Sequence, residues 1–412
     1  MTPAHEFPES FWWGTGASSP QSEGAAPASD WLAWERAGRL PASGDGNGFG
    51  TRFREDFELY AAHGLTHHRM GIEWARIEPE DGVRDPVAVE HYRTVLEAAR
   101  EAGIEPWACL HHFVLPDWVG DGGFRDWKAI RDRWCRHVEF VAETYGDLVA
   151  GWKPINEPIA YALAGFLSGH RPPGEHDRAL MLEALEGIHL AKYEAARILH
   201  QTGKPVATIH VLIPMFPGDS TPSSAAALEE LDQLVWGCWI GALRDGVLQI
   251  PHRTPVEVPD YPEVFDLVGF SYYFSATVGA DGKLGPYPPG AEVGLMGYVP
   301  WSGGLGLVLD RLARELPGRP LLVSEHGVGT HDDEMRSAFL KESLGVVSDR
   351  LTAGLDIRGF FHWTGVDNYE WNRAFDVPFG LFDRDRRPKG SAALLRSYAL
   401  RHDALAPARP AV

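Results

Sequence analysis

The feature that most constrains the fold is an alternation of short β-prone runs with longer amphipathic segments. Eight apolar runs rich in strand-forming residues recur along the chain: Phe11–Ala17, Thr66–Trp74, Glu105–Phe113, Leu148–Ile155, Val206–Leu212, Leu267–Tyr273, Leu321–Ser324 and Ile357–Trp363. Segments with helical spacing lie between them: Val87–Ala102, Lys128–Tyr145, Arg178–Gln201, Ser224–Arg244, Gly304–Glu315 and Asp332–Ala353. Eight strands alternating with helices predict an α/β fold with a parallel sheet closed into a (β/α)8 TIM barrel.

An open, doubly wound sheet is the competing architecture. Such a sheet usually has a Gly-rich phosphate loop after its first strand, but Gly14-Thr15-Gly16 lacks the later glycine at the required spacing. The barrel is therefore favoured. Because α/β barrels commonly run long as one unit, we expect residues 1–412 to form a single barrel domain.

Composition excludes some classes of binding partner and indicates the cellular compartment. A formal net charge of −19 argues against nucleic acid and anionic membranes, because both require basic surfaces. The three cysteines show no metal-binding or disulfide spacing. The N-terminal residues do not resemble a signal peptide, and no apolar stretch approaches membrane-spanning length. We expect a cytoplasmic protein with reduced thiols; the oligomeric state stays open.

Acidic and polar residues stand where predicted strands end. Asn156-Glu157-Pro158 follows the fourth strand, and Ser324-Glu325-His326-Gly327 ends the seventh. The carboxyl ends of barrel strands converge on one cleft, so these two glutamates should face each other. Cleavage of a glycosidic bond uses such a pair, with pKa values separated by their surroundings. Two Pro/Gly-rich stretches, His170–Gly174 and Gly279–Gly297, are expected to be loops on the same face.

The sequence resembles glycoside hydrolase family 1, the retaining β-glycosidases of the β-glucosidase type. The matching segments occur in the family's order: Phe11–Gly14, Gln21–Gly24, Arg69–Ile77, Leu110–Pro116, Gly122–Phe124, Asn156–Pro158, Ser324–Gly327 and Phe379–Leu381. The resemblance implies hydrolysis of a terminal, non-reducing β-D-glycosyl residue (a glucoside, galactoside or fucoside) through a covalent glycosyl-enzyme. The implied partner is a small β-glycoside or oligosaccharide, and no metal or other cofactor is expected.

The resemblance also implies roles for individual residues. Glu157 is the expected acid/base and Glu325 the expected nucleophile, with their carboxyl groups about 5–5.5 Å apart. Arg69 and Tyr273 match residues that contact the nucleophile, and both would favour its ionised form. The residues that match the sugar-binding set are Gln21, His112, Asn156, Trp363, Glu370 and Trp371.

Several positions depart from the family pattern. His326 follows the nucleophile where asparagine is usual, so its imidazole either alters the hydrogen bonding of Glu325 or points away and supports the loop. Ser271 replaces an asparagine and Phe113 a tryptophan, and both changes fall around the expected glycone pocket, where sugar preference is set. Glu370 is retained, which argues against a 6-phospho-sugar substrate.

Three alternatives remain at this point. Four histidines, His67, His68, His111 and His112, would suit a metal-dependent barrel hydrolase, but the first strand ends without metal ligands. A β-transglycosylase would use the same site with an alcohol as acceptor. A non-catalytic sugar-binding barrel would keep the fold without the reaction. The sequence does not identify the glycone or the natural aglycone.

Overall fold

The computed structural model describes residues 7–400, in which one eight-stranded parallel sheet forms the centre. Its strands lie in the order β4-β3-β2-β1-β13-β12-β9-β5. Their bounds are Trp12–Gly16 (β1), His67–Gly71 (β2), Glu105–Cys109 (β3), Gly151–Lys153 (β4), His210–Val211 (β5), Val268–Tyr272 (β9), Leu321–His326 (β12) and Ile357–Trp363 (β13). The two ends of this order meet where Trp152 and Val206 form a parallel bridge, and the Ala207 N–H donates to the Trp152 carbonyl at 2.9 Å. The predicted (β/α)8 barrel is confirmed.

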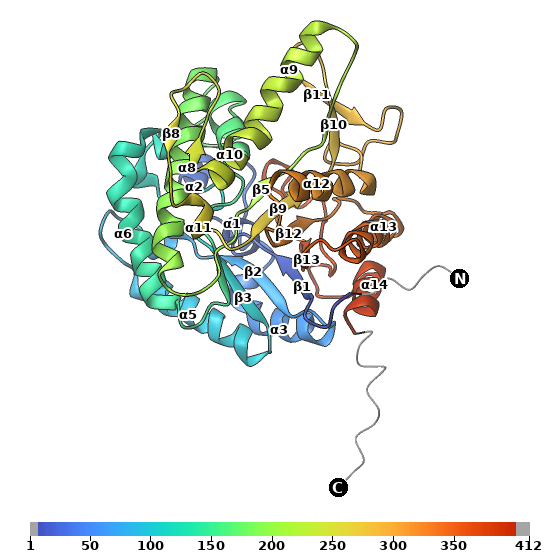
Figure 1. The fold of residues 1–412 in the computed structure, drawn as a ribbon. Helices are drawn as coiled ribbons and strands as arrows, with labels where there is room; N and C mark the ends of the chain where they lie inside the picture. Colours follow the sequence, from blue (N-terminus) through green and yellow to red (C-terminus); the bar gives the residue numbers. More distant parts are fainter. Residues whose placement is uncertain (1–6, 401–412) are drawn as a thin grey trace.

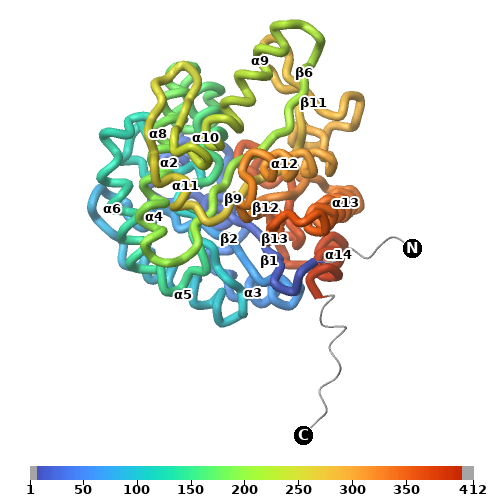
Figure 2. The backbone as a smooth tube through the Cα atoms, viewed as in Figure 1, coloured from blue at the N-terminus to red at the C-terminus, as the bar shows by residue number. Residues whose placement is uncertain are grey.

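Helices surround the sheet, as Figures 1 and 2 show. They include α3 (Phe49–Ala62), α5 (Pro86–Glu101), α6 (Trp127–Tyr145), α8 (Arg178–His200), α10 (Cys238–Asp245), α12 (Ser302–Glu315), α13 (Asp333–Thr352) and α14 (Gly390–Ala399). Aspartates begin three of them: the side chains of Asp85, Asp177 and Asp332 accept hydrogen bonds from backbone N–H groups in the first turns of α5, α8 and α13. These caps satisfy N–H groups that have no partner within the helix. Helices α3 and α14 were not predicted.

Some predicted elements differ from the observed ones in extent. The strand predicted over Thr66–Trp74 ends at Gly71, because Trp74 already begins the short helix α4 (Trp74–Ile77). The helix predicted over Ser224–Arg244 consists of α9 (Pro222–Asp232), one π-helical turn and α10. Such a turn inserts an extra residue without ending the helix, so apolar spacing alone does not reveal it.

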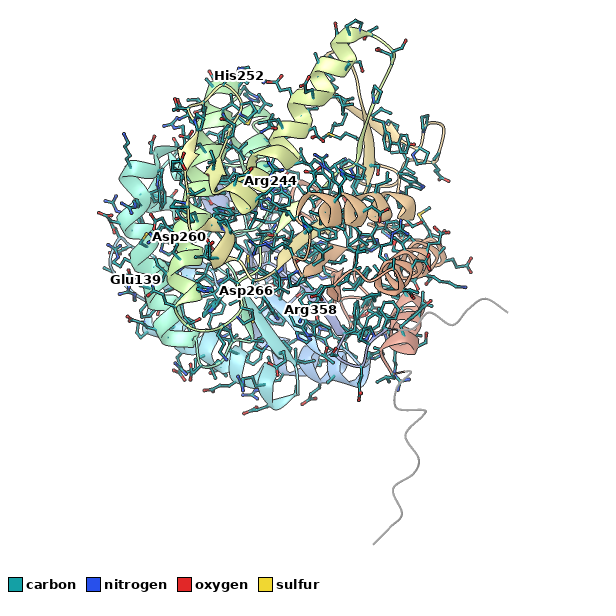
Figure 3. All side chains as sticks on the ribbon, viewed as in Figure 1. Glu139, Arg244, His252, Asp260, Asp266 and Arg358 are labelled. Carbon is teal, nitrogen blue, oxygen red and sulfur yellow. The ribbon has the colours of Figure 1, made fainter. Side chains whose placement is uncertain are left out.

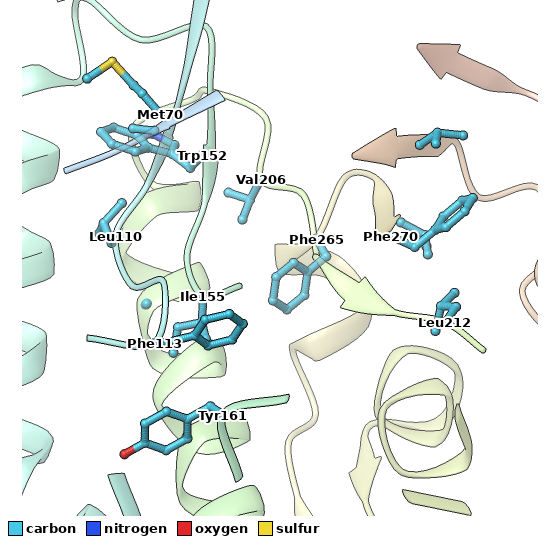
Figure 4. Close-up of a cluster of buried hydrophobic side chains, with 14 of the residues drawn as sticks. Met70, Leu110, Phe113, Trp152, Ile155, Tyr161, Val206, Leu212, Phe265 and Phe270 are labelled. Atoms are coloured by element: carbon cyan, nitrogen blue, oxygen red, sulfur yellow. The ribbon is translucent and has the colours of Figure 1, made fainter. Parts of the chain in front are cut away.

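Two separate clusters of apolar side chains hold the barrel together. One, contributed by several strands and their flanks, fills the barrel interior with Trp107, Ala207, Leu267, Leu322 and Phe361. The much larger cluster joins the strands to the surrounding helices, and Figure 4 shows part of it, including Met70, Trp152, Phe265 and Phe270. The filled interior leaves the carboxyl ends of the strands as the place for a site.

A small outer sheet projects from the barrel beside α9 (Figures 1 and 2). It contains β6 (Met215–Pro217), β10 (Ser275–Val278) and β11 (Leu284–Tyr287). The stretch Gly279–Gly297, expected to be a loop, therefore includes one strand of a hairpin.

The charged side chains labelled in Figure 3, among them Glu139, Arg244 and Asp260, are exposed on the outer surface. This is the usual place for charges in a globular chain, where water solvates them. Over residues 7–400, every helix falls short of the length and apolarity needed to cross a membrane.

Candidate active site

The predicted site residues lie in or just beyond the carboxyl-terminal parts of seven strands. They are Gln21 after β1, Arg69 in β2, His112 after β3, Asn156 and Glu157 after β4, Tyr273 after β9, Glu325 in β12, and Trp363, Glu370 and Trp371 at and after β13. All are buried except Tyr273, which is partly buried. Direct contacts or electrostatic interactions connect them into one constellation.

The carboxylate of Glu325 is held by two donors. Arg69 is fully buried and forms an ion pair with it, and the Tyr273 hydroxyl donates to its Oε2 atom at 2.5 Å. Both interactions stabilise a negative charge on this carboxyl group, so they favour the ionised form. Glu325 is only 3% exposed, so water contributes little to that stabilisation.

Glu157 has a different environment. It precedes the short helix α7 (Pro158–Ala162) with φ of 42°, and its backbone N–H donates to the Ile209 carbonyl at 3.1 Å. Its Oε1 atom is buried without a hydrogen-bond partner among residues 7–400. Burial raises the pKa of Glu157, and the Ser271 hydroxyl, Arg171 and Arg69 offset part of the rise. This surrounding favours a carboxyl group that keeps its proton.

The two carboxyl groups share neighbours on β9. Ser271 lies level with Glu325 in the β9–β12 register and also acts on the carboxyl group of Glu157. Tyr273, two residues further along, donates to Glu325 and is influenced electrostatically by Glu157. The two glutamates therefore face the same part of the barrel mouth. The separation of about 5–5.5 Å stays a prediction.

His112 links Arg69 to Asn156. The Arg69 guanidinium can only donate, so the 2.8 Å contact makes Nδ1 of His112 an acceptor. Burial, followed by Arg69, lowers the pKa of His112 well below its usual value, so the ring is neutral and carries its proton on Nε2. The atom of Asn156 that lies 3.3 Å from that nitrogen is Nδ2, and its Oδ1 atom has no hydrogen-bond partner within residues 7–400. Because two donors cannot bond to each other, we expect the amide to be turned by 180°, so that Oδ1 accepts the Nε2 proton and the NH2 group is free to donate to a ligand.

Glu370 and Gln21 form a second polar pair. Gln21 Nε2 donates to Glu370 Oε2 at 3.0 Å and to the Tyr369 carbonyl at 2.8 Å, while the Ser18 hydroxyl donates to Gln21 Oε1. Burial raises the pKa of Glu370 to about 7, against the opposing effect of Arg171. The pair can therefore offer an acceptor whose charge changes near neutral pH.

Aromatic rings form the walls around these polar groups. Trp363 and Trp371 both stack against His112, with ring centroids 5.7 and 5.8 Å away. Phe113 lies 5.5 Å from Trp371. Apolar walls with a few convergent polar groups are typical of small-molecule sites, and the apolar face of a sugar ring packs well on such rings.

The sequence over residues 4–402 matches the family described as glycosyl hydrolase family 1. The chain belongs to glycosyl hydrolase family 1. The predictions of this family, of an O-glycosyl hydrolase and of a β-glycosidase are confirmed.

The alignments with relatives in family 1 cover most of each relative and most of this chain. β-Glucosidase A of Thermotoga maritima is 24% identical and aligns over 91% of this chain and 92% of its own. Thermostable β-glucosidase B of Thermobispora bispora is 29% identical, over 89% and 84%. A solved β-glycosidase from Pyrococcus horikoshii superimposes with a TM-score of 0.87 at 29% identity, over 96% of this chain and 95% of that one. The family 1 β-glucosidase structure from Thermotoga maritima, at 22% identity and a TM-score of 0.88, supports the fold.

Two further side chains near this family 1 site were not predicted from the sequence. The Arg171 guanidinium lies 4.3 Å from the ring centroid of Phe113 and 4.7 Å from that of Trp371. Tyr298 stacks on Phe274 at 4.5 Å and is influenced electrostatically by Glu370 and by Glu157. Arg171 lies in a Pro/Gly-rich stretch already expected on this face and Tyr298 directly follows the other, but nothing in their spacing singled out these side chains.

His326 faces away from the nucleophile. Its ring stacks on Phe339 of α13 at 4.5 Å and lies 5.0 Å from Phe360. Neither ring nitrogen has a hydrogen-bond partner among residues 7–400, and burial, with a smaller effect of His362, lowers the pKa of His326 well below its usual value. Successive residues of a strand point to opposite faces, which explains why Glu325 faces the site and His326 faces the helices.

This orientation yields a prediction for His326→Met. We expect the free energy of unfolding to rise by about 1 kcal/mol, because an apolar side chain replaces two buried nitrogens without partners. The kcat/KM on an aryl β-glycoside should stay within about threefold of wild type, since the ring touches neither glutamate. Urea unfolding and steady-state kinetics test the two parts. A tenfold loss of kcat/KM in a variant of undiminished stability would mean that His326 does act on the nucleophile.

The four histidines considered as metal ligands lie in separate surroundings. His68 pairs with the Thr15 hydroxyl and His67 with that of Thr66, both at 2.8 Å, while His112 pairs with Arg69. The His111 ring instead packs edge-on against the rings of Phe124 and Tyr161. In the part of the chain that the structure describes, no group of three or more His, Cys, Asp or Glu side chains is placed to hold a metal ion.

Proposed function

We propose that this chain is a retaining β-glycosidase with Glu325 as the nucleophile and Glu157 as the acid/base. Glu325 attacks the anomeric carbon while Glu157 gives its proton to the departing oxygen, so the glycosidic bond breaks as a glycosyl ester forms. Glu157 then removes a proton from water, which displaces Glu325 and releases the sugar with its original configuration.

The observation that carries this proposal is the difference between the surroundings of two neighbouring carboxyl groups. Glu325 receives an ion pair and a hydroxyl donor, whereas Glu157 is buried with a raised pKa and has an oxygen without a partner among residues 7–400. A nucleophile must be ionised and a general acid must hold a proton at the same pH. Divergent environments are the usual way in which one site meets both needs.

The polar and aromatic groups around the pair support a neutral sugar as the glycone. The proposed sugar-binding residues are Gln21, His112, Asn156, Trp363, Glu370 and Trp371. Asn156 has an amide that can donate to a sugar hydroxyl, and Glu370 can accept from one. A phosphate on the sugar would be repelled by an ionised Glu370, so we propose a non-phosphorylated glucoside, galactoside or fucoside.

The stereochemical outcome of the first turnovers tests this function. With a nitrophenyl β-glycoside, proton NMR should show the β-anomer of the free sugar first and the α-anomer only later, through mutarotation. First appearance of the α-anomer would exclude the double displacement, since a single displacement inverts the configuration. A panel of nitrophenyl β-glycosides then identifies the glycone from the highest kcat/KM.

We further propose that residues 1–412 act as one barrel domain in the cytoplasm. The three cysteines, Cys109, Cys135 and Cys238, are free, and two are buried. Free thiols are typical of a reducing compartment. No cofactor enters the proposed steps, because the two carboxyl groups supply both proton transfer and the covalent bond.

A further inference from the structure

Arg171 is a cation at the site, and within the described residues 7–400 it has no direct counter-ion. Its Nη1 atom is buried and has no hydrogen-bond partner, and within residues 7–400 no carboxylate lies at ion-pair distance. The carboxyl groups of Glu370 and Glu157 nevertheless act on it electrostatically. Buried donors are normally paired, so a buried Nη1 atom without a partner in a sugar-binding cleft suggests a ligand contact.

The backbone holds Arg171 in place from two sides. The N–H groups of His170 and Arg171 both donate to the Ala164 carbonyl, at 3.0 and 3.3 Å. On the other side, Asn372 Nδ2 donates to the His170 carbonyl at 3.1 Å, and Asn372 directly follows Trp371. The loop is thus tied to the segment that carries Glu370 and Trp371, and a side chain positioned in this way loses less freedom when it binds a ligand.

The guanidinium also rests on the aromatic wall of the site. Phe113 and Trp371 lie beneath it, with their ring centroids 4.3 and 4.7 Å from its central carbon. Such stacking stabilises the cation and fixes its plane. Burial lowers the pKa of Arg171 to about 10, so it stays protonated at neutral pH.

The hydrogen-bonding groups of Arg171 and Glu370 favour a hydroxyl group as the ligand. Arg171 can only donate hydrogen bonds, and ionised Glu370 can only accept them, whereas a hydroxyl does both. An anionic substituent would meet Arg171 but also the carboxyl groups of Glu370, Glu157 and Glu325. We propose that Arg171 is a further substrate-binding residue, which donates to a glycone hydroxyl that Glu370 accepts from. This inference rests on the proposed function and makes Arg171 a determinant of sugar specificity.

The first test compares two matched arginine-to-methionine variants. Arg171→Met keeps much of the stem but removes every donor, and we expect kcat/KM on a neutral aryl β-glycoside to fall about 10–100-fold, largely through KM. Arg84→Met is the control, because Arg84 also stacks on an aromatic ring, that of Phe140 at 3.9 Å, away from the site. Its kcat/KM should stay within about twofold of wild type. Equal losses in the two variants would overturn the proposal.

A series of monodeoxy aryl glycosides, each lacking one ring hydroxyl, gives the sharper result. One of them should be hydrolysed with similar kcat/KM by wild type and by Arg171→Met, because the hydroxyl that Arg171 contacts is missing. The same compound should reduce the effect of Glu370→Gln. If Arg171→Met lowers kcat/KM on every deoxy glycoside as much as on the parent glycoside, Arg171 does not contact a glycone hydroxyl. A wild-type preference for a β-uronide that Arg171→Met abolishes would also overturn the proposal, in favour of an anion site.

Covalent labelling separates this inference from the function on which it rests. An activated 2-deoxy-2-fluoro β-glycoside should label Glu325 stoichiometrically in wild type and, more slowly, in Arg171→Met. Labelling of Glu325 together with unchanged kinetics in Arg171→Met would reject the role of Arg171 and leave the proposed function standing. Failure to label wild type would reject both.

Discussion

Replacing Glu325 with glycine is expected to lower kcat on an aryl β-glycoside by about 10⁵-fold, because removing the nucleophile of a two-step mechanism has effects of this order. Added azide should restore part of the lost rate. Loss of the side chain leaves room beside the anomeric carbon, and azide can attack there while Glu157 still protonates the departing oxygen. The product should be the α-glycosyl azide, since one displacement inverts the configuration. Kinetics with and without azide, followed by NMR of the product, provide the measurement.

Glu325→Gln is the matched control for this experiment. Its amide fills the same space, so it should be equally inactive, but azide should not rescue it. Both variants remove the partner of the buried Arg69 and should unfold at a lower temperature, because an unpaired buried charge is destabilising. Rescue by azide shows that the glycine variant is folded. A glycine variant that keeps the wild-type rate would exclude Glu325 as the nucleophile.

The sequence was most informative at the strand ends. Alternation of strands and helices indicates a barrel, and a barrel brings Asn156-Glu157 and Glu325 to one face however far apart they lie in the chain. The family pattern then placed Gln21 and Glu370 in one set of sugar-binding residues, and the structure shows a hydrogen bond between them. Such residues can be predicted from local sequence patterns, because each lies within or a few residues after a regular strand.

Other features depend on tertiary contacts that local patterns do not contain. Arg171 points over Phe113 and Trp371 because its loop is held by carbonyls of the preceding helical segment and by Asn372. No periodicity encodes that arrangement. The orientation of His326 was left open for a related reason: the sequence does not show which side chains pack beside it, and the structure places its ring against Phe339 of α13.

Replacing Glu157 with alanine should distinguish its role as general acid from its role as general base. On a substrate with a poor leaving group, such as an alkyl β-glycoside, we expect kcat/KM to fall about 10²–10⁴-fold, the usual contribution of general acid catalysis. On a dinitrophenyl β-glycoside the loss of kcat/KM should be much smaller, because this leaving group departs without a proton. Turnover should then be limited by release of the glycosyl group from Glu325, since no base activates water.

Azide should speed that release and yield the β-glycosyl azide, because it attacks the covalent intermediate from the side that Glu157 occupied. The opposite anomers from the Glu325 and Glu157 variants would assign the two roles independently. The pH profile adds a third criterion. Burial raises the pKa of Glu157, its protonated form is the active acid, and activity is lost as the pH rises through that pKa. The alanine variant should therefore lose the alkaline limb of kcat/KM that Glu157 causes in wild type. If the limb persists unchanged, the proton comes from another group, and Glu370, with a pKa raised to about 7, would be the residue to replace next.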